Sequence, residues 1–278
     1  MSGRVVVGVD GSEESVTAVD WAADEAALRG AELRLVNASL WQEHPVVVAV
    51  QPARDVRAER ARDLLGAMTD RARSRRTSLT TSTEEIEDAP AGVLLSASAH
   101  ADLVVLGSHG FSVGTGFTAG SVGQAVAAEA DSPVVLVRES TPDGDGAVVV
   151  GLDILSPGEE LLAFAFAFAA RRSAPVRVVH TWHLTPLHPH GGGSAAEEAG
   201  KEALGEAVRS VRERFPEVKV ELVATAGRAA GHLIQAATGS AIVVVGRRRG
   251  HALRGHIGAV AHAVIHHAAS PVAVVPHT

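Results

Sequence analysis

The chain contains the same four apolar segments twice, in the same order. The matching pairs are RVVVGVD (4–10) with AVVVGLD (147–153), ELRLVNA (32–38) with PVRVVHT (175–181), ADLVVLG (101–107) with SAIVVVG (240–246), and SPVVLV (132–137) with SPVAVV (270–275). Four ordered matches indicate two homologous halves. The fold must therefore be one that half of a 278-residue chain can adopt twice.

A polar segment separates the two halves. ESTPDGDGA at 139–147 places Pro and Gly between the last apolar run of the first half and the first run of the second. This composition is typical of a linker between domains. We therefore expect one domain at 1–140 and a second at 146–278.

Within each half, short Val-rich runs alternate with longer Ala-rich stretches. LVVLG at 103–107 is apolar at almost every position, as expected of a strand covered on both faces of a parallel sheet. ESVTAVDWAADEAALRG at 14–30 has helical spacing, with Ser12 as the expected cap and Gly30 as the stop. The pattern predicts an α/β fold of two tandem doubly wound domains, each with a five-stranded parallel sheet.

The expected elements have similar positions in both halves. Strands are expected near 4–10, 32–38, 79–86, 102–107 and 133–138, and again near 147–153, 175–181, 218–224, 241–246 and 271–276. First-half helices are expected near 13–29, 53–75, 90–99 and 119–130.

Composition excludes several classes of protein. A content of 46% hydrophobic residues is enough for a substantial core, and the absence of cysteine excludes disulfides and thiolate zinc sites. The formal net charge of −7 argues against a general nucleic-acid binder. The N-terminal apolar run is too short for a signal peptide, and no window approaches the length of a membrane span. We expect a cytoplasmic protein that contacts neither nucleic acid nor membrane.

Candidate ligand-binding residues follow the strands of the first half. In a doubly wound sheet, a ligand lies beyond the carboxyl ends of the strands, where the strand order reverses. Asp10 ends the first expected strand, Asn37 and Ala38 end the second, and Gly107 ends the fourth. An acidic side chain at this place can accept hydrogen bonds from ribose hydroxyls.

The loop GSHGFSVGTGFTAGSVG at 107–123 has the composition of a phosphate site. Gly120, Ser121 and Val122 are expected to open a helix, whose free N–H groups and positive end attract anions. Glycine lets the backbone approach a phosphate closely, and the Ser121 hydroxyl adds a donor. Together with Asp10, the loop predicts a nucleotide ligand.

Two common nucleotide motifs are excluded. The GxxxxGK[ST] loop requires a lysine, and the only lysines are Lys201 and Lys219. The GxGxxG fingerprint must follow the first strand, where the turn reads GVDGSEES. What remains is Gly107, two residues, Gly110, nine residues, then Gly120 and Ser121.

This spacing, G-x2-G-x9-G-[ST], is the ATP-binding signature of the universal stress proteins. Over nearly all of both halves, the chain resembles the tandem, two-domain bacterial members of that family. The resemblance implies a Rossmann-like fold of the adenine nucleotide alpha hydrolase-like type. It also implies a nucleotide-responsive regulator of the stress response, with ATP as the cofactor, with or without Mg²⁺.

The resemblance further implies roles for single residues. Asp10 would meet the ribose, the backbone around Val9 and Ala38 would meet adenine, and the glycine-rich loop would cradle the phosphates. The implied nucleotide-binding residues are Gly8, Val9, Asp10, Ala38, Gly107, Gly110, Gly120, Ser121 and Val122. The alternative is that the glycines serve tight turns only.

The second half departs from this pattern. Its loop GRRRGHALRGHIGA is one residue shorter, has Arg249 in place of Gly110 and has Ala259 in place of Ser121. Asp153 matches Asp10, but we expect the bulky Ile154 and Leu155 after it to crowd the ribose region. We therefore predict one nucleotide site per chain and one degenerate site. The basic residues there are expected to attract an anion, to form a solvated loop or to contact the other half: Arg247, Arg248, Arg249 and Arg254.

Two clusters of basic residues have ordinary interpretations. His262 and His266 have the spacing of two zinc ligands on a helix, but the glutamate of HExxH is absent, so no metal site is expected. RARSRRT at 71–77 is interpreted as the solvated end of a helix, where cations are favourable.

No catalytic constellation is found in the sequence. A kinase loop and a paired-carboxylate signature are absent, so no catalytic residue is proposed. Three hypotheses remain: a nucleotide-binding regulator, a weak ATPase or self-phosphorylating protein, and an interaction module that needs no ligand.

Two covalently joined copies suggest a pseudo-twofold arrangement. Exposed edge strands need a partner, so we expect the halves to pack as a pseudo-dimer with 133–138 facing 271–276. This detail follows from the family resemblance. A homodimer of whole chains is a further expectation.

Overall fold

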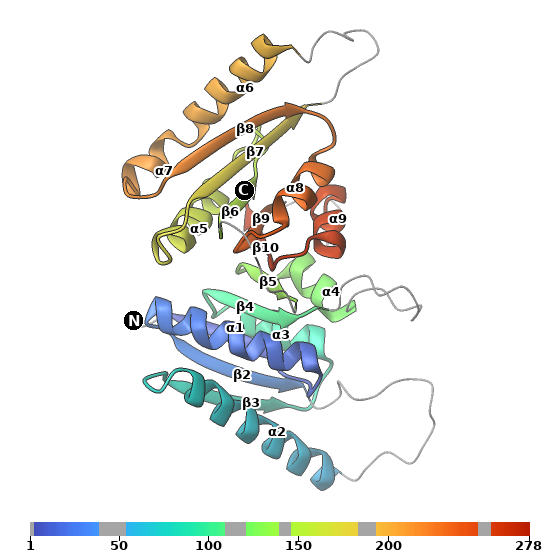
Figure 1. Cartoon of the computed structure of the whole chain (residues 1–278). Coiled ribbons are helices and arrows are strands. Elements are labelled where there is room, and N and C mark those ends of the chain that lie inside the picture. The colour runs from blue at the N-terminus through green and yellow to red at the C-terminus, as the bar shows by residue number, and fades with distance from the viewer. Residues whose placement is uncertain (1–2, 39–53, 109–120, 139–145, 183–192, 250–256) are drawn as a thin grey trace. The chain divides into compact units, whose positions relative to one another are not determined.

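The computed structural model describes residues 3–38, 54–108, 121–138, 146–182, 193–249 and 257–278 (Figure 1). The side chains of Arg54 and Ser121 lie outside this description. The chain divides into two compact units, Met1–Glu139 and Ser140–Thr278.

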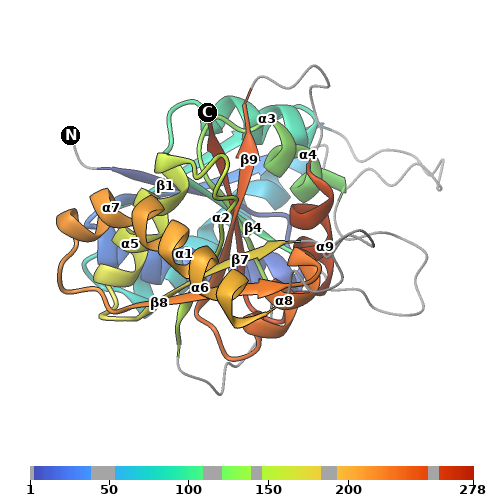
Figure 2. The same ribbon diagram turned by 90° about the horizontal axis from the view of Figure 1, so that it is seen from above.

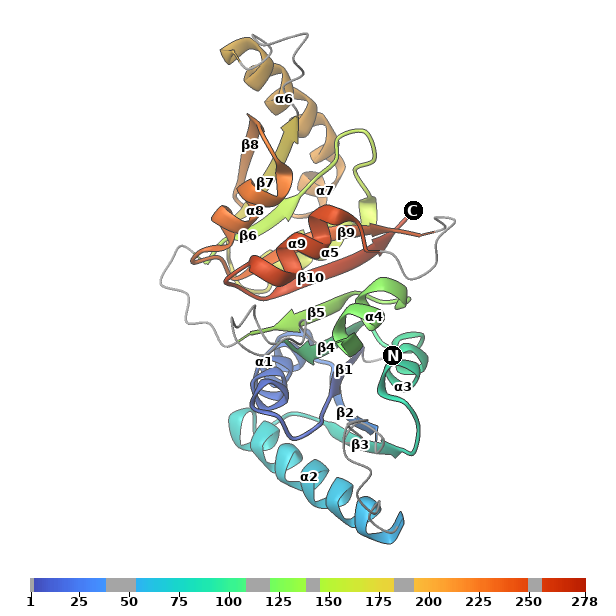
Figure 3. The ribbon, with the colours of Figure 1, turned by 90° about the vertical axis from the view of Figure 1, so that its right-hand side faces the viewer.

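The first unit alternates strands and helices. Its elements are β1 (Arg4–Gly8), α1 (Glu13–Arg29), β2 (Glu32–Ala38), α2 (Arg54–Arg75), β3 (Thr81–Ile86), α3 (Pro90–Ser98), β4 (Leu103–Gly107), α4 (Ser121–Glu129) and β5 (Val134–Val137). The strands are parallel in the order β3-β2-β1-β4-β5. Figure 3 shows α1 and α2 on one side of this sheet and α3 and α4 on the other.

The second unit repeats this topology. Its elements are β6 (Val148–Gly151), α5 (Glu159–Ala170), β7 (Val176–Trp182), α6 (Ser194–Ala207), α7 (Arg209–Arg214), β8 (Val220–Ala226), α8 (Ala229–Ala237), β9 (Ile242–Arg248), α9 (Ala259–His267) and β10 (Val272–His277). The parallel order is β8-β7-β6-β9-β10. Figures 1 and 2 both show α5 and α7 on the side opposite α8 and α9. The predicted doubly wound α/β fold is confirmed for each half.

The central strands explain why the fold has two helical layers. Val5, Val6 and Val7 of β1 are each 0% exposed, and the same holds for Val104 and Val105 of β4. Because successive strand residues point to opposite faces, complete burial requires helices on both sides of the sheet.

Helix α1 has the start and the stop that the sequence predicts. The Ser12 hydroxyl accepts a hydrogen bond from the backbone N–H of Ser15 at 3.1 Å. Gly30 adopts a left-handed conformation at φ 62°, and its N–H reaches the carbonyls at the end of the helix. A residue without Cβ adopts this conformation at little cost, which ends the helix there.

The basic end of α2 is exposed to solvent, as predicted, and its arginines also bind carboxylates of α1. Arg71 donates to both carboxylate oxygens of Asp20, each at 2.6 Å. Arg75 donates to both oxygens of Asp24, at 2.9 and 2.7 Å, and Arg76 donates to the same carboxylate at 2.9 Å. The hydrogen bond to Asp20 raises the pKa of Arg71 above its ordinary value. These pairs connect two helices that cover the same face of the sheet.

Replacing Arg71 should measure what this connection contributes. The Arg71 side chain is 47% exposed and that of Asp20 is 22% exposed, so solvent screens the pair. We expect Arg71→Ala to lower the free energy of unfolding by about 0.5–1 kcal/mol in low salt, and by less in concentrated NaCl. Urea denaturation at the two salt concentrations is the measurement.

Arg209→Ala is the matched control for this experiment. Arg209 pairs with Glu206, and both side chains are about two-thirds exposed. We expect its loss to change the free energy of unfolding by less than about 0.3 kcal/mol. Equal effects of the two substitutions would contradict a specific contribution of the α1–α2 pairs.

Candidate functional site

The strand order of each unit creates one position where a ligand is expected. From β1, the chain proceeds through β2 to β3 on one side, and β4 and β5 lie on the other. In the second unit, β6 takes the place of β1, between β7 and β9. The helices leaving the two sides diverge at this reversal, which opens a crevice at the carboxyl ends of the strands.

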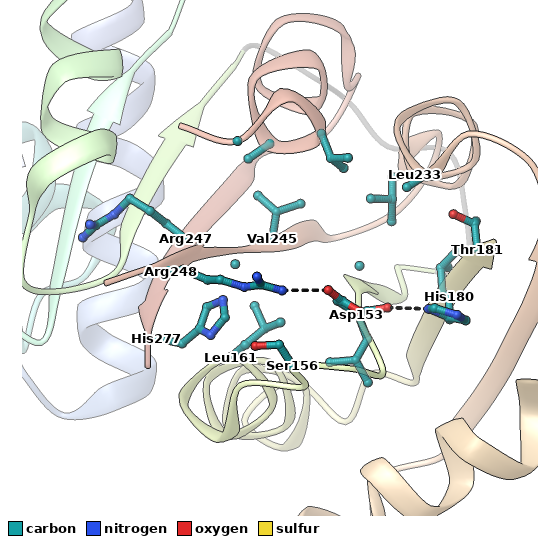
Figure 4. A pocket seen from close by; sticks show the side chains of 18 residues that line it. Asp153, Ser156, Leu161, His180, Thr181, Leu233, Val245, Arg247, Arg248 and His277 are labelled. Atoms are coloured by element: carbon teal, nitrogen blue, oxygen red, sulfur yellow. Dashed lines mark hydrogen bonds and ion pairs between the residues drawn. The ribbon is translucent and has the colours of Figure 1, made fainter. Parts of the chain in front are cut away.

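In the second unit, this crevice is a well-formed cavity of about 660 Å³ (Figure 4). It lies at the carboxyl ends of β6, β7 and β9 and extends to the starts of α8 and α9. Its described lining residues are Gly151, Leu152, Asp153, Ser156, Leu161, Val179, His180, Thr181, Ala229, Leu233, Val245, Gly246, Arg247, Arg248, Gly258, Val260, Ala261 and His277.

An acidic residue of this cavity is already paired. Asp153 accepts a hydrogen bond from the Leu155 backbone N–H at 3.0 Å through Oδ1. Its Oδ2 accepts from the Arg248 guanidinium at 2.8 Å, and both side chains are about half exposed. Figure 4 shows Arg248 running across the pocket to reach this carboxylate. The repeat equivalent of the predicted ribose acceptor is therefore engaged by an arginine.

A side chain at the end of the second strand supports the residue before each acid. In the first unit, Asn37 is 3% exposed and donates from Nδ2 to the Val9 carbonyl at 2.7 Å. In the second unit, His180 Nδ1 lies 3.0 Å from the Leu152 carbonyl. Because a carbonyl only accepts, His180 must carry a hydrogen on Nδ1 to make this bond. The two halves thus use different side chains for the same connection.

Asp10 of the first unit has the same turn but a different partner arrangement. Its Oδ1 accepts from the Ser12 backbone N–H at 2.9 Å and from the Ser12 hydroxyl at 2.6 Å. No residue in the described part of the chain donates a hydrogen bond to its Oδ2.

A glycine in the carboxyl-terminal part of the fourth strand of each half, Gly107 in β4 and Gly246 in β9, permits a close approach by protein atoms. A Cβ on Gly107 would lie 2.4 Å from the carbonyl carbon of Glu14 in α1. A Cβ on Gly246 would lie 2.6 Å from Nε2 of His277, and one on Gly158 would lie 2.8 Å from Nδ1 of the same ring. At this position, tight packing within the protein is sufficient to require glycine.

The predicted nucleotide-binding residues of the first half divide into two groups. Those that the structure describes lie at the carboxyl ends of β1, β2 and β4 or in the first turn of α4: Gly8, Val9, Asp10, Ala38, Gly107 and Val122. Gly110 and Gly120 lie outside the described residues, as does the side chain of Ser121, the first residue of α4. Their phosphate-binding role stays a prediction.

The comparisons with known proteins agree with this topology. The model of the "Universal stress protein family" matches residues 1–138 and 146–276. The chain belongs to the universal stress protein family. Universal stress protein Rv2005c of Mycobacterium tuberculosis is 39% identical, with 97% of this chain and 96% of that protein covered. A universal stress protein of Mycolicibacterium smegmatis is 30% identical, with 98% and 96% covered.

Solved structures of universal stress proteins resemble the chain as well. One from Archaeoglobus fulgidus has a TM-score of 0.75 at 16% identity and covers both chains completely, which shows the shared fold. A universal stress protein solved in complex with cAMP matches 50% of this chain at 29% identity, with a TM-score of 0.39. The complex with cAMP was found for that protein.

The expected crowding by Ile154 and Leu155 is wrong. Neither side chain lines the described pocket, and Leu155 is 89% exposed. Because Leu155 belongs to the turn that closes on Asp153, its side chain points to solvent. The residues that reshape the second pocket are instead Arg248 and His277. Sequence comparison placed Arg248 in a basic loop, but its pairing with Asp153 across 95 positions could not be seen.

The histidine pair on α9 lies outside this pocket. The His262 and His266 ring centroids are 4.4 Å apart, and His266 is 6% exposed. Within the described ranges, no group of three or more His, Cys, Asp or Glu side chains is arranged to hold a metal ion. The described helices also include none that is long and apolar enough to cross a membrane.

Replacing Gly107 should reveal its packing role. We expect Gly107→Ala to lower the free energy of unfolding by about 1–3 kcal/mol, because α1 would have to move away from β4. Chemical denaturation is the measurement.

Gly92→Ala provides the control for Gly107→Ala. Gly92 lies in α3, and a Cβ there would meet nothing within 4 Å. This substitution should raise the stability by about 0.5–1 kcal/mol. If the Gly107→Ala protein is as stable as the wild type, the backbone at Glu14 can move away from the added Cβ without loss of stability.

Proposed function

We propose that this universal stress protein is a regulator that binds an adenine nucleotide, and that its first half takes ATP. The observation that carries the proposal is the position of Asp10. Its carboxylate lies at the carboxyl end of β1, where the strand order reverses, and its Oδ1 is held by Ser12. A fixed acceptor at this place suits the hydroxyls of a ribose.

Two neighbouring features fit the rest of the nucleotide. Val9 and Ala38 lie at the carboxyl ends of β1 and β2, near Asp10, where their backbone would face the base. The Asn37 side chain holds the Val9 carbonyl, so the backbone that would face adenine is ordered in advance. Such preorganisation reduces the entropy lost on binding.

The start of α4 supports a phosphate site. This helix begins at Ser121, directly after the segment that carries Gly110 and Gly120. The N–H groups of a first helical turn lack intrahelical acceptors and face an anion placed at the helix end. We propose that Mg²⁺ would enter together with the ATP phosphates, because the described residues provide no cluster of metal ligands.

We propose a regulatory role for the bound nucleotide. No triad or paired-carboxylate signature is present in the sequence, so the chemistry of the chain supports binding. Ligand-dependent association or conformation would then convert nucleotide occupancy into a response. We further propose a cytoplasmic location, which a cysteine-free chain suits. The homodimer and the pseudo-dimer packing of the halves stay predictions.

The first test is nucleotide content and affinity. We expect denaturation of the purified protein to release ATP at about one per chain, detected by mass spectrometry. Titration of nucleotide-free protein with ATP and Mg²⁺ in a calorimeter should then show one site. A preparation without nucleotide that also gives no binding heat would overturn the proposal.

Two equivalent aspartates provide a matched pair of variants. Asp10→Asn keeps an Oδ1 acceptor for Ser12, so α1 retains its start, but it removes the charge offered to ribose. We expect it to weaken ATP binding by about tenfold, the size of a charged hydrogen bond. Asp153→Asn should leave ATP binding within about twofold of wild type, because Arg248 already holds Asp153. Equal losses in both variants would contradict a single nucleotide site.

A further inference from the structure

The second-half pocket has the size of a functional site even though its sequence has lost the nucleotide signature. Its volume of about 660 Å³ lies within the range of cavities that hold small molecules. All of its described lining residues belong to the second unit. The pocket therefore exists independently of the nucleotide site proposed for the first half.

The walls of this pocket suit an apolar ligand body. Leu152, Leu161, Leu233 and Val245 all line it, and each is between 1% and 4% exposed. Leu152 directly follows β6, and the other three come from α5, α8 and β9, so the apolar surface surrounds the cavity from several elements. Burying apolar ligand surface against such walls is favourable by roughly 25 cal/mol per Å².

The charges of the pocket suit an anionic group. Arg248 brings a guanidinium into the pocket and Asp153 a carboxylate, whereas the Arg247 side chain points away from it (Figure 4). Helix α9 also begins at the pocket, where its N-cap Gly258 supplies no side-chain cap. The positive end of the helix and the Arg248 charge both favour an anion in this pocket. Hydrogen bonds from these donors are stronger to an anionic oxygen than to a neutral one.

A triphosphate nucleotide fits this arrangement poorly. The Asp153 oxygen that corresponds to the ligand-facing oxygen of Asp10 accepts from Arg248 at 2.8 Å. His277 is 5% exposed, and its ring lies against Gly246, the equivalent of Gly107. Arginine side chains thus replace backbone as the source of positive charge.

We propose that the second half binds a small organic anion with an apolar body. Its single anionic head, a carboxylate, a sulfonate or one phosphate, binds Arg248. Its body packs against Leu152, Leu161, Leu233 and Val245. Figure 4 shows Arg248 passing between Val245 and Leu161, so the guanidinium and the apolar walls face the same space.

The direction in which a substitution of Asp153 changes ligand binding tests this site. Asp153 competes with the ligand head for Arg248, since both offer oxygen acceptors to the same guanidinium. Removing the carboxylate charge therefore strengthens anion binding. If the carboxylate served as a ribose acceptor, its removal would have the opposite effect and would weaken ligand binding.

The experiment compares two fluorescent probes with the same aromatic body. The first is 1-anilinonaphthalene-8-sulfonate, and the second is its neutral counterpart, N-phenyl-1-naphthylamine. Both are titrated into the full chain carrying Asp10→Asn, so the first-half site is weakened and the two proposals fail separately. We expect the sulfonate probe to bind at about one per chain and more tightly than the neutral probe.

Charge variants then assign the head group. Arg248→Gln should weaken binding of the sulfonate probe by about fivefold. Asp153→Asn should tighten its binding by about threefold, and both sizes are those expected for half-exposed charges. The neutral probe should change by less than about twofold in both variants. Arg209→Gln, which removes an arginine outside the pocket, is the matched control and should change neither probe.

A steric variant assigns the place. Val260 lines the pocket and is 40% exposed, so Val260→Trp narrows the mouth without opening the core. We expect it to weaken both probes at least fivefold. Leu155→Trp changes an exposed residue outside the lining and should leave the binding of both probes unchanged.

Three outcomes of the probe titrations would overturn the proposal. They are the absence of one-to-one binding of the sulfonate probe, weaker sulfonate binding by Asp153→Asn, and insensitivity of both probes to Val260→Trp. Displacement of the bound sulfonate probe by ATP at the nucleotide concentrations that fill the first half would also overturn it, since the pocket would then be a nucleotide site.

Discussion

Burial of the central strands on both faces is the constraint on which the rest of the structure depends. The valines of β1 and β4 are fully inaccessible to water, so helices must cover both sides of the sheet. Right-handed crossovers to two sides then reverse the strand order beside β1 and beside β6. The crevice at each reversal is therefore a consequence of the hydrophobic core. The polar groups that can contact a ligand lie at the carboxyl ends of the strands beside it.

A small number of polar contacts fixes the backbone at the carboxyl-terminal end of each sheet. Asn37 and His180, at equivalent positions, hold the carbonyl that precedes Asp10 and Asp153, respectively. Each acid then closes a turn onto a backbone N–H two residues later. Because this framework is the same in both halves, the difference between them lies in what contacts the second carboxylate oxygen. In the second half, that contact is Arg248.

The divergence of the halves is a change in the source of positive charge. The first half follows the family pattern, in which a glycine-rich loop and a helix start would present backbone N–H groups to phosphates. The second half has arginine side chains, a histidine ring against its glycine and a preserved cavity of about 660 Å³. Loss of a sequence signature therefore did not remove the pocket. It changed which ligands the pocket suits.

The sequence by itself determined the repeat, the α/β class, the strand positions and the limits of α1, because these depend on local apolar patterns and capping residues. It also predicted that Asp10 and Gly107 lie at the same end of the sheet, since the carboxyl ends of parallel strands lie together. Only the tertiary structure decided what lies beside them: Glu14 against Gly107, His277 against Gly246 and Arg248 on Asp153. These contacts join residues far apart in the chain, and long side chains reach their partners in directions that no local pattern specifies. For the same reason, the sequence predicted crowding by Leu155, whereas the turn directs that side chain to solvent.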